Sequence, residues 1–68
     1  QTRERFEAAM AQLAVDDQQA VRARLEQGLS YDEIATLVGK PSADAARMAV
    51  ARAVKRLATL MAATSGQA

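Results

Sequence analysis

Basic side chains in the second part of the chain are the residues best suited to do chemistry, namely to bind phosphates or the edges of bases. Residues 40–68 contain five Lys and Arg but only one acidic residue, Asp44, whereas residues 1–39 contain four Arg and seven Asp and Glu. The two parts therefore carry charges of +4 and −3 within a net charge of +1. Such segregation is typical of a surface that meets nucleic-acid phosphates, and an ordinary solvated helix face is the alternative.

Several residue types that other chemistries need are missing. The chain has no His and no Cys, which removes the usual general base, the usual zinc ligands and any disulfide. Its carboxylates, Ser and Lys form no catalytic grouping, and no glycine-rich phosphate loop is present. We therefore expect no enzyme, no catalytic residue, no metal site and no cofactor.

The cellular location of the protein can also be predicted from its composition. No apolar run reaches the roughly 20 residues that span a bilayer, and no signal peptide is recognisable. The absence of Cys fits a reducing compartment, so we expect a cytoplasmic protein without membrane association. Because the chain starts with Gln1 rather than Met, we expect a domain of a longer protein.

The elements that must position the basic residues are all helical. Seventeen alanines favour helix throughout, and strand patterns are absent. We predict an all-α fold, a small three- to four-helix bundle that contains a helix-turn-helix. Residues 1–15 would form an N-terminal helix or the end of an inter-domain linker, residues 16–62 the helix-turn-helix domain, and residues 63–68 a flexible tail.

The N-terminal segment has one apolar stripe. Phe6, Met10 and Leu13 have the spacing i, i+4, i+7, which predicts a helix from Thr2 to Leu13. If this helix does not fold back on the domain, Phe6 and Met10 would offer an apolar stripe to a partner protein.

The next helix is predicted from its capping residues. Asp16 is a suitable N-cap, and Gln19 lies at capping-box spacing from it. We expect a helix over residues 17–27, with Val21 and Leu25 on its inner face.

A helix-turn-helix is predicted over residues 30–57. Ser30 and Glu33 form a capping box that opens a short helix, Gly39 permits the positive φ of a tight turn, and Ser42 caps the following helix. The apolar positions of the short helix are Tyr31, Ile34, Ala35, Leu37 and Val38. A helix, a tight turn and a basic second helix in this order make the chain a candidate DNA reader.

The second helix of the motif has an inner and an outer face. Its inner stripe comprises Ala43, Ala46, Val50, Val54, Leu57 and Met61. The residues that point away from it are Asp44, Met48, Arg52, Lys55 and Arg56, with Arg47 and Ala51 on the border.

Candidate DNA-binding residues lie at the start of both motif helices and in the turn, because the major groove accepts the N-terminal half of the second helix. We expect Arg47 to read guanine or grip a phosphate, and Arg52 and Lys55 to clamp phosphates. The complete candidate set is Ser30, Tyr31, Lys40, Ser42, Asp44, Ala45, Arg47, Met48, Ala51, Arg52 and Lys55.

Several of these candidates could also have a role that does not involve DNA. Arg47 and Lys55 could be solvated surface charges, and Ser30 could be only a helix cap. Asp44 could accept from a cytosine amino group or complement the helix dipole. Met48 could touch a thymine methyl group or a protein partner.

The stretch GLSYDEIATLVGKPSADAARMAVARAVKRL, from Gly28 to Leu57, resembles region 4 of bacterial RNA polymerase sigma factors, especially the small extracytoplasmic-function group. The similar parts are the start from Gly28 to Ala35, the Val38-Gly39 turn and the close from Arg52-Ala53 to Arg56-Leu57. The resemblance extends over about residues 13–60. Two features depart from the family pattern. The turn with Lys40-Pro41-Ser42 is one residue longer, and Ala45 and Ala49 replace a hydroxyl residue and an arginine.

The resemblance implies recognition of the promoter −35 element, which directs RNA polymerase to initiate transcription. The implied partners are double-stranded promoter DNA, the RNA polymerase core through its β flap, and an anti-sigma factor or other regulator. One alternative is the DNA-binding domain of a response-regulator or quorum-sensing-type activator, whose start is similar. A second is a protein-interaction module that has kept the fold but lost DNA binding, which Ala45 and Ala49 suggest. A third is a structural helical bundle without a partner.

Overall fold

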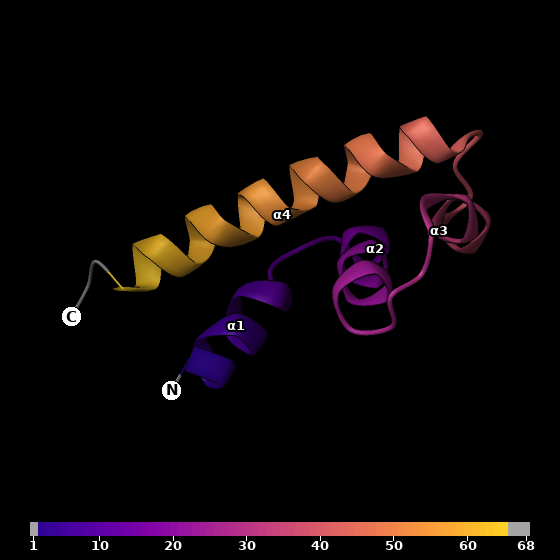
Figure 1. Ribbon diagram of the computed structural model, residues 1–68. Helices are drawn as coiled ribbons and strands as arrows, with labels where there is room; N and C mark the ends of the chain where they lie inside the picture. The colour runs from indigo at the N-terminus through magenta and orange to yellow at the C-terminus, as the bar shows by residue number, and fades with distance from the viewer. Residues whose placement is uncertain (1, 66–68) are drawn as a thin grey trace.

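The long C-terminal helix organises the molecule. The computed structural model describes residues 2–65, which form α1 (Thr2–Met10), α2 (Val15–Leu25), α3 (Tyr31–Val38) and α4 (Ala43–Ser65), with no strand among them. The three shorter helices lie along one side of α4, and each contacts it (Figure 1). The all-α prediction is therefore confirmed. None of the helices in the described part is long and apolar enough to cross a membrane.

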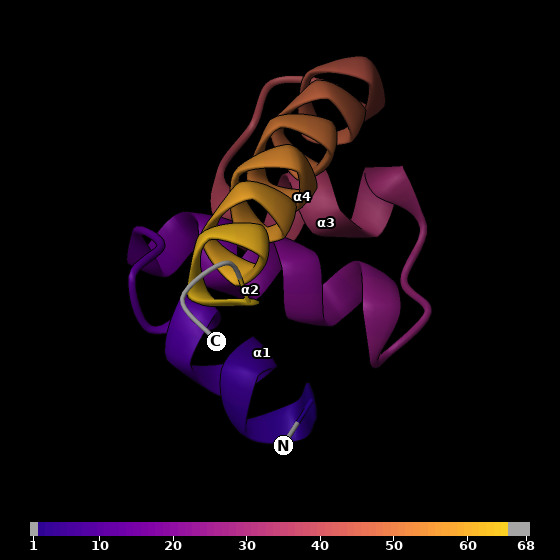
Figure 2. The ribbon, with the colours of Figure 1, turned by 90° about the vertical axis from the view of Figure 1, so that its left-hand side faces the viewer.

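Two apolar clusters hold the helices together, and α2 contributes to both. The first contains Ala9, Met10, Leu13, Val21, Ala53 and Leu57, and the second contains Ala20, Ala23, Ile34, Ala35, Ala46 and Val50. Figure 2, seen nearly along α4, shows α1, α2 and α3 grouped under the same face of that helix. Two thirds of the residues in these clusters are alanines or valines, and such short side chains let helices approach closely.

Helix α1 packs against the rest of the molecule. Met10 is fully buried, and Phe6 is half-buried against the first cluster. The apolar stripe is therefore covered by the domain itself and is not free for a partner. The helix ends at Met10, earlier than predicted, and Leu13 is buried from the turn that follows it.

Helix α2 starts earlier than its predicted cap. The N-cap is Ala14, which makes no side-chain cap, so the prediction of Asp16 as N-cap was wrong. Asp16 instead lies in the first turn of α2, where a negative charge still favours the helix dipole. The prediction that Leu25 is internal was also wrong, since 59% of it is exposed. It lies in the last turn of α2, and Ala23 is buried instead.

Helix α3 has the predicted ends. The Ser30 hydroxyl accepts the Glu33 N–H at 3.1 Å, and the Glu33 carboxylate accepts the Ser30 N–H at 2.8 Å. At the other end Gly39 has φ of 73°, and the Lys40 N–H donates to the Ala35 carbonyl. Leu37 is half exposed, contrary to prediction. It lies beside the buried stripe of α3, which follows the spacing i, i+3, i+4, i+7 from Tyr31.

Helix α4 begins and packs largely as predicted. The Ser42 hydroxyl accepts the Ala45 N–H at 3.1 Å, which confirms the cap. Val54 was wrongly predicted to be internal and is 36% exposed, whereas Ala53 is buried. The helix continues through residues 63–65, where a flexible tail was predicted. The remainder of that predicted tail, residues 66–68, lies outside the described residues.

Candidate nucleic-acid interface

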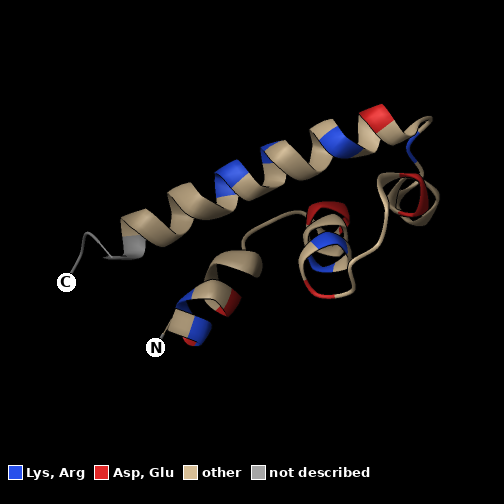
Figure 3. Cartoon of the chain, viewed as in Figure 1, with Lys and Arg blue, Asp and Glu red and all other residues tan. Residues whose placement is uncertain are grey.

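An exposed stripe runs along α4 on the side opposite its buried face. Asp44, Met48, Ala51 and Lys55 follow the spacing i, i+4, i+7, i+11 and are all exposed. Arg47 and Arg52 are exposed on either border of this stripe. Figure 3 shows the basic residues spread along α4 as far as its middle, with an acidic residue in the first turn. Along the stripe and its borders three basic residues outnumber one acidic residue, which suits a helix that enters a major groove.

Arg47 is held by a neighbour on its own helix. Its Nη2 donates a hydrogen bond to Oδ1 of Asp44 at 2.7 Å, and both side chains are more than half exposed. This hydrogen bond, with the attraction between the two charges, raises the pKa of Arg47. Asp44 therefore has a role that the sequence analysis missed, because it restrains the side chain most suited to read a base. Its place in the first turn of α4 also suits the helix dipole.

A hollow of about 590 Å³ lies beside the stripe, between α4 and the facing ends of α2 and α3. Its lining has three cations and no carboxylate, and its other residues are apolar except for one tyrosine. The lining residues are Arg24, Leu25, Tyr31, Arg47, Val50, Ala51, Val54 and Lys55. The hollow thus joins candidate residues from α3 and α4 with an arginine from α2.

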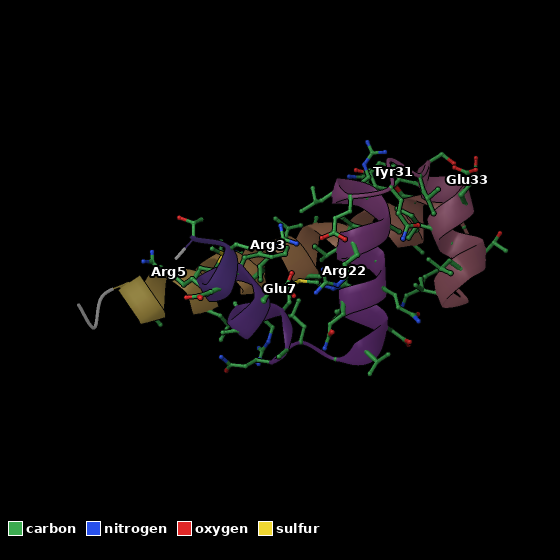
Figure 4. All side chains as sticks on the ribbon, turned by 90° about the horizontal axis from the view of Figure 1, so that it is seen from below. Arg3, Arg5, Glu7, Arg22, Tyr31 and Glu33 are labelled. Atoms are coloured by element: carbon green, nitrogen blue, oxygen red, sulfur yellow. The ribbon has the colours of Figure 1, made fainter. Side chains whose placement is uncertain are left out.

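Arg24 was not among the candidates predicted from the sequence. Its guanidinium lies 4.2 Å from the centre of the Tyr31 ring, and its Nη1 donates to the Leu29 carbonyl at 3.0 Å. Tyr31 is half-buried between the ends of α2 and α3 (Figure 4). No pattern local to α2 distinguishes Arg24 from other surface arginines, since only the packing of α2 against α3 and α4 brings it to the hollow.

Comparison with known families decides what kind of helix-turn-helix this is. The family model described as Sigma-70, region 4 matches residues 3–57, which is most of the chain. The chain belongs to the sigma-70 region 4 family. No curated protein and no solved structure matched it.

Membership in this family carries a general function. Region 4 is a DNA-binding helix-turn-helix domain of sigma factors, which act in transcription initiation, and it is not an enzyme family. Its partners are promoter DNA and the RNA polymerase core. Among the described residues, no group of His, Cys, Asp and Glu could hold a metal ion.

Three candidates of this region 4 domain lie in or near the turns. The hydroxyl oxygens of Ser30 and Ser42 each accept a capping N–H, so their O–H groups are what they could offer to a phosphate. Lys40 is exposed between α3 and α4. All three flank the start of a motif helix, where backbone N–H groups also favour an anion.

The two alanines that depart from the family pattern have different surroundings. Ala49 is buried, with only 5% of it exposed, so a small residue there is explained by packing. Ala45 is half-buried near the start of α4. Only Ala45 therefore remains as a substitution that could weaken contact with DNA.

Proposed function

We propose that this domain recognises the −35 element of a promoter as region 4 of a sigma factor of the extracytoplasmic-function group. The observation that carries the proposal is the exposed stripe of α4, which begins at a capped turn and is bordered by Arg47. The N-terminal half of α4 would lie in the major groove, as the second helix of such motifs does. The resemblance of residues 28–57 to the extracytoplasmic-function group supports the narrower assignment.

The candidate residues would divide into base readers and phosphate contacts. Arg47 would donate to a guanine, and Met48 would contact a thymine methyl group. Arg52, Lys55 and Lys40 would bind phosphates, which fix the register without reading the sequence. The remaining candidates would lie on the same DNA-binding surface, and they are Ser30, Tyr31, Ser42, Asp44, Ala45 and Ala51.

Protein partners would complete this function. We propose that the domain works in the cytoplasm, docks on the β flap of RNA polymerase and is controlled by an anti-sigma factor or another regulator. These proposals rest on the family match and on the resemblance of residues 28–57 to the extracytoplasmic-function group.

The test is fluorescence anisotropy with a panel of −35-like duplexes across a salt series. We expect sequence-dependent binding that weakens as salt rises. Arg47→Ala should reduce discrimination between the best duplex and a scrambled one by about tenfold or more, since a bidentate arginine contact contributes about 1–3 kcal/mol.

Arg56→Ala is the matched control. This substitution removes the same charge from the same helix. Arg56 lies nine residues after Arg47, which is two and a half helical turns, so the two side chains are on opposite flanks of α4. Equal binding to every duplex, or none even at low salt, would contradict promoter reading by this domain and favour a protein-interaction module.

A further inference from the structure

We infer that Arg24, in the helix that precedes the helix-turn-helix, is a phosphate-binding residue, and that the hollow beside α4 receives one strand of the DNA backbone. The inference rests on the proposed function, because it adds a contact to the same DNA complex. It assigns a role to a residue and to a surface that neither the sequence pattern nor the family match singles out.

The charges around the hollow favour an anionic occupant. Arg24 approaches it from α2, and Arg47 and Lys55 approach it from α4. No carboxylate lines it, and the carboxylate that pairs with Arg47, that of Asp44, lies outside the lining. Phosphates bridged by deoxyribose fit such a surface, since the sugar presents C–H groups to the apolar floor formed by Leu25 and Val54 while the phosphates meet the cations.

Two contacts hold the Arg24 guanidinium in place before any phosphate binds. Stacking on Tyr31 holds the plane of the guanidinium, and one hydrogen bond to the Leu29 carbonyl anchors its Nη1. A guanidinium has five N–H donors, so others stay available for phosphate oxygens. Because the side chain is held in advance, binding a phosphate costs it less rotational freedom than a mobile arginine would lose.

The position of the hollow suits a backbone strand. It borders the exposed stripe of α4 through Arg47, Ala51 and Lys55, and its other wall includes Tyr31 at the first residue of α3. When the second helix of the motif lies in the major groove, the first helix of the motif crosses the sugar-phosphate backbone that bounds the groove. Helix α2 would therefore add a contact from outside the motif.

The experiment is anisotropy on one specific and one scrambled duplex, across salt, with Arg24→Ala, Arg24→Lys and the Arg56→Ala control. Arg24→Ala should weaken binding to both duplexes alike, by about three- to tenfold, as expected for one exposed charge-assisted contact. The slope of log K against log salt should fall by about 0.9. Arg24→Lys should keep the slope but bind more weakly than the wild type, because lysine keeps the charge and loses the planar stack.

Failures of the two proposals give different patterns. If Arg24→Ala behaves like Arg56→Ala while Arg47→Ala still loses discrimination, the inference about Arg24 is overturned and promoter reading stands. If Arg24→Ala keeps wild-type DNA affinity but loses binding to an acidic amphipathic helical peptide, the hollow is a protein site and the inference is equally overturned. If the wild type binds no duplex, promoter reading itself fails. Circular dichroism confirms that each variant is folded.

Discussion

At the scale of single residues, the pair formed by Asp44 and Arg47 has the clearest functional consequence. An exposed ion pair three residues apart on a helix adds little to stability. Its effect is positional, because it holds the Arg47 guanidinium toward the first turn of α4. Asp44 thereby limits where this arginine can reach and also places a negative charge close to the proposed DNA surface.

Asp44→Asn should therefore change specificity and not folding. We expect affinity for a scrambled duplex to rise several-fold, because a carboxylate that repels phosphates is gone, while the preference for the best −35-like duplex falls. Anisotropy with both duplexes measures the two effects together. Asp16→Asn, which removes an equivalent charge from the first turn of α2, is the control.

A double-mutant cycle separates positioning from simple charge. If Asp44 acts through Arg47, the effects of Asp44→Asn and Arg47→Ala on discrimination will not add. Additive effects would show that Asp44 acts only by its charge.

At the scale of elements, the turn between α3 and α4 sets where the proposed reading helix begins. Gly39 ends α3 in the left-handed conformation, and Ser42 caps α4 three residues later. Both ends of this short connection are thus held by local backbone chemistry. The direction in which α4 leaves the turn depends on them, together with the packing of Ala46 and Val50 against α3.

Gly39→Ala should destabilise the fold by about 1–2 kcal/mol, since an L side chain is strained at this positive φ. Apart from Gly39 and its two chain neighbours, no residue has an atom within 4 Å of the position that the Cβ would take, so backbone strain and not a clash is the cause. Urea unfolding measures the change. Thr36→Ala, exposed on the same helix, should stay within about 0.5 kcal/mol of the wild type. An unchanged midpoint for Gly39→Ala would mean that the turn relaxes without strain.

At the scale of the whole molecule, α4 and α2 connect the proposed DNA-binding surface with the N-terminal helix, α1. The first cluster packs α1 on the C-terminal part of α4, and the second packs α3 on its N-terminal part. An ion pair reinforces the first, with Arg22 Nη2 at 2.6 Å from Glu7 Oε1. The two side chains point toward one another between α1 and α2 (Figure 4). We infer that the four helices unfold as one unit.

Met10→Ala tests whether α1 belongs to that unit. Met10 is fully buried in the first cluster, so its truncation should cost about 2–5 kcal/mol. That is a large share of the roughly 3–10 kcal/mol expected for a chain of this length. Met48→Ala is the matched control, because 47% of Met48 is exposed and its loss should change stability little. A Met10→Ala midpoint equal to that of the control would show that α1 is detached from the cooperative core.

The sequence by itself determined the helical class and the features that depend on a few neighbouring residues. The capping box of Ser30 and Glu33, the left-handed Gly39 and the Ser42 cap were all predicted and are all present. Each is a matter of backbone N–H and C=O groups finding partners within one turn, so the local residue types suffice. The exposed stripe of α4, from Asp44 to Lys55, follows from helical periodicity in the same way.

Only the tertiary structure decided which side of each helix is covered. Leu25, Leu37 and Val54 fit apolar patterns but are exposed, while the smaller Ala23, Ala49 and Ala53 are buried. In alanine-rich helices several faces are apolar enough to pack, and the close approach of neighbouring helices selects the face with the smallest side chains. The same packing brings Arg24 to the edge of α4. Contacts of this kind join residues far apart in the chain, and no local spacing encodes them.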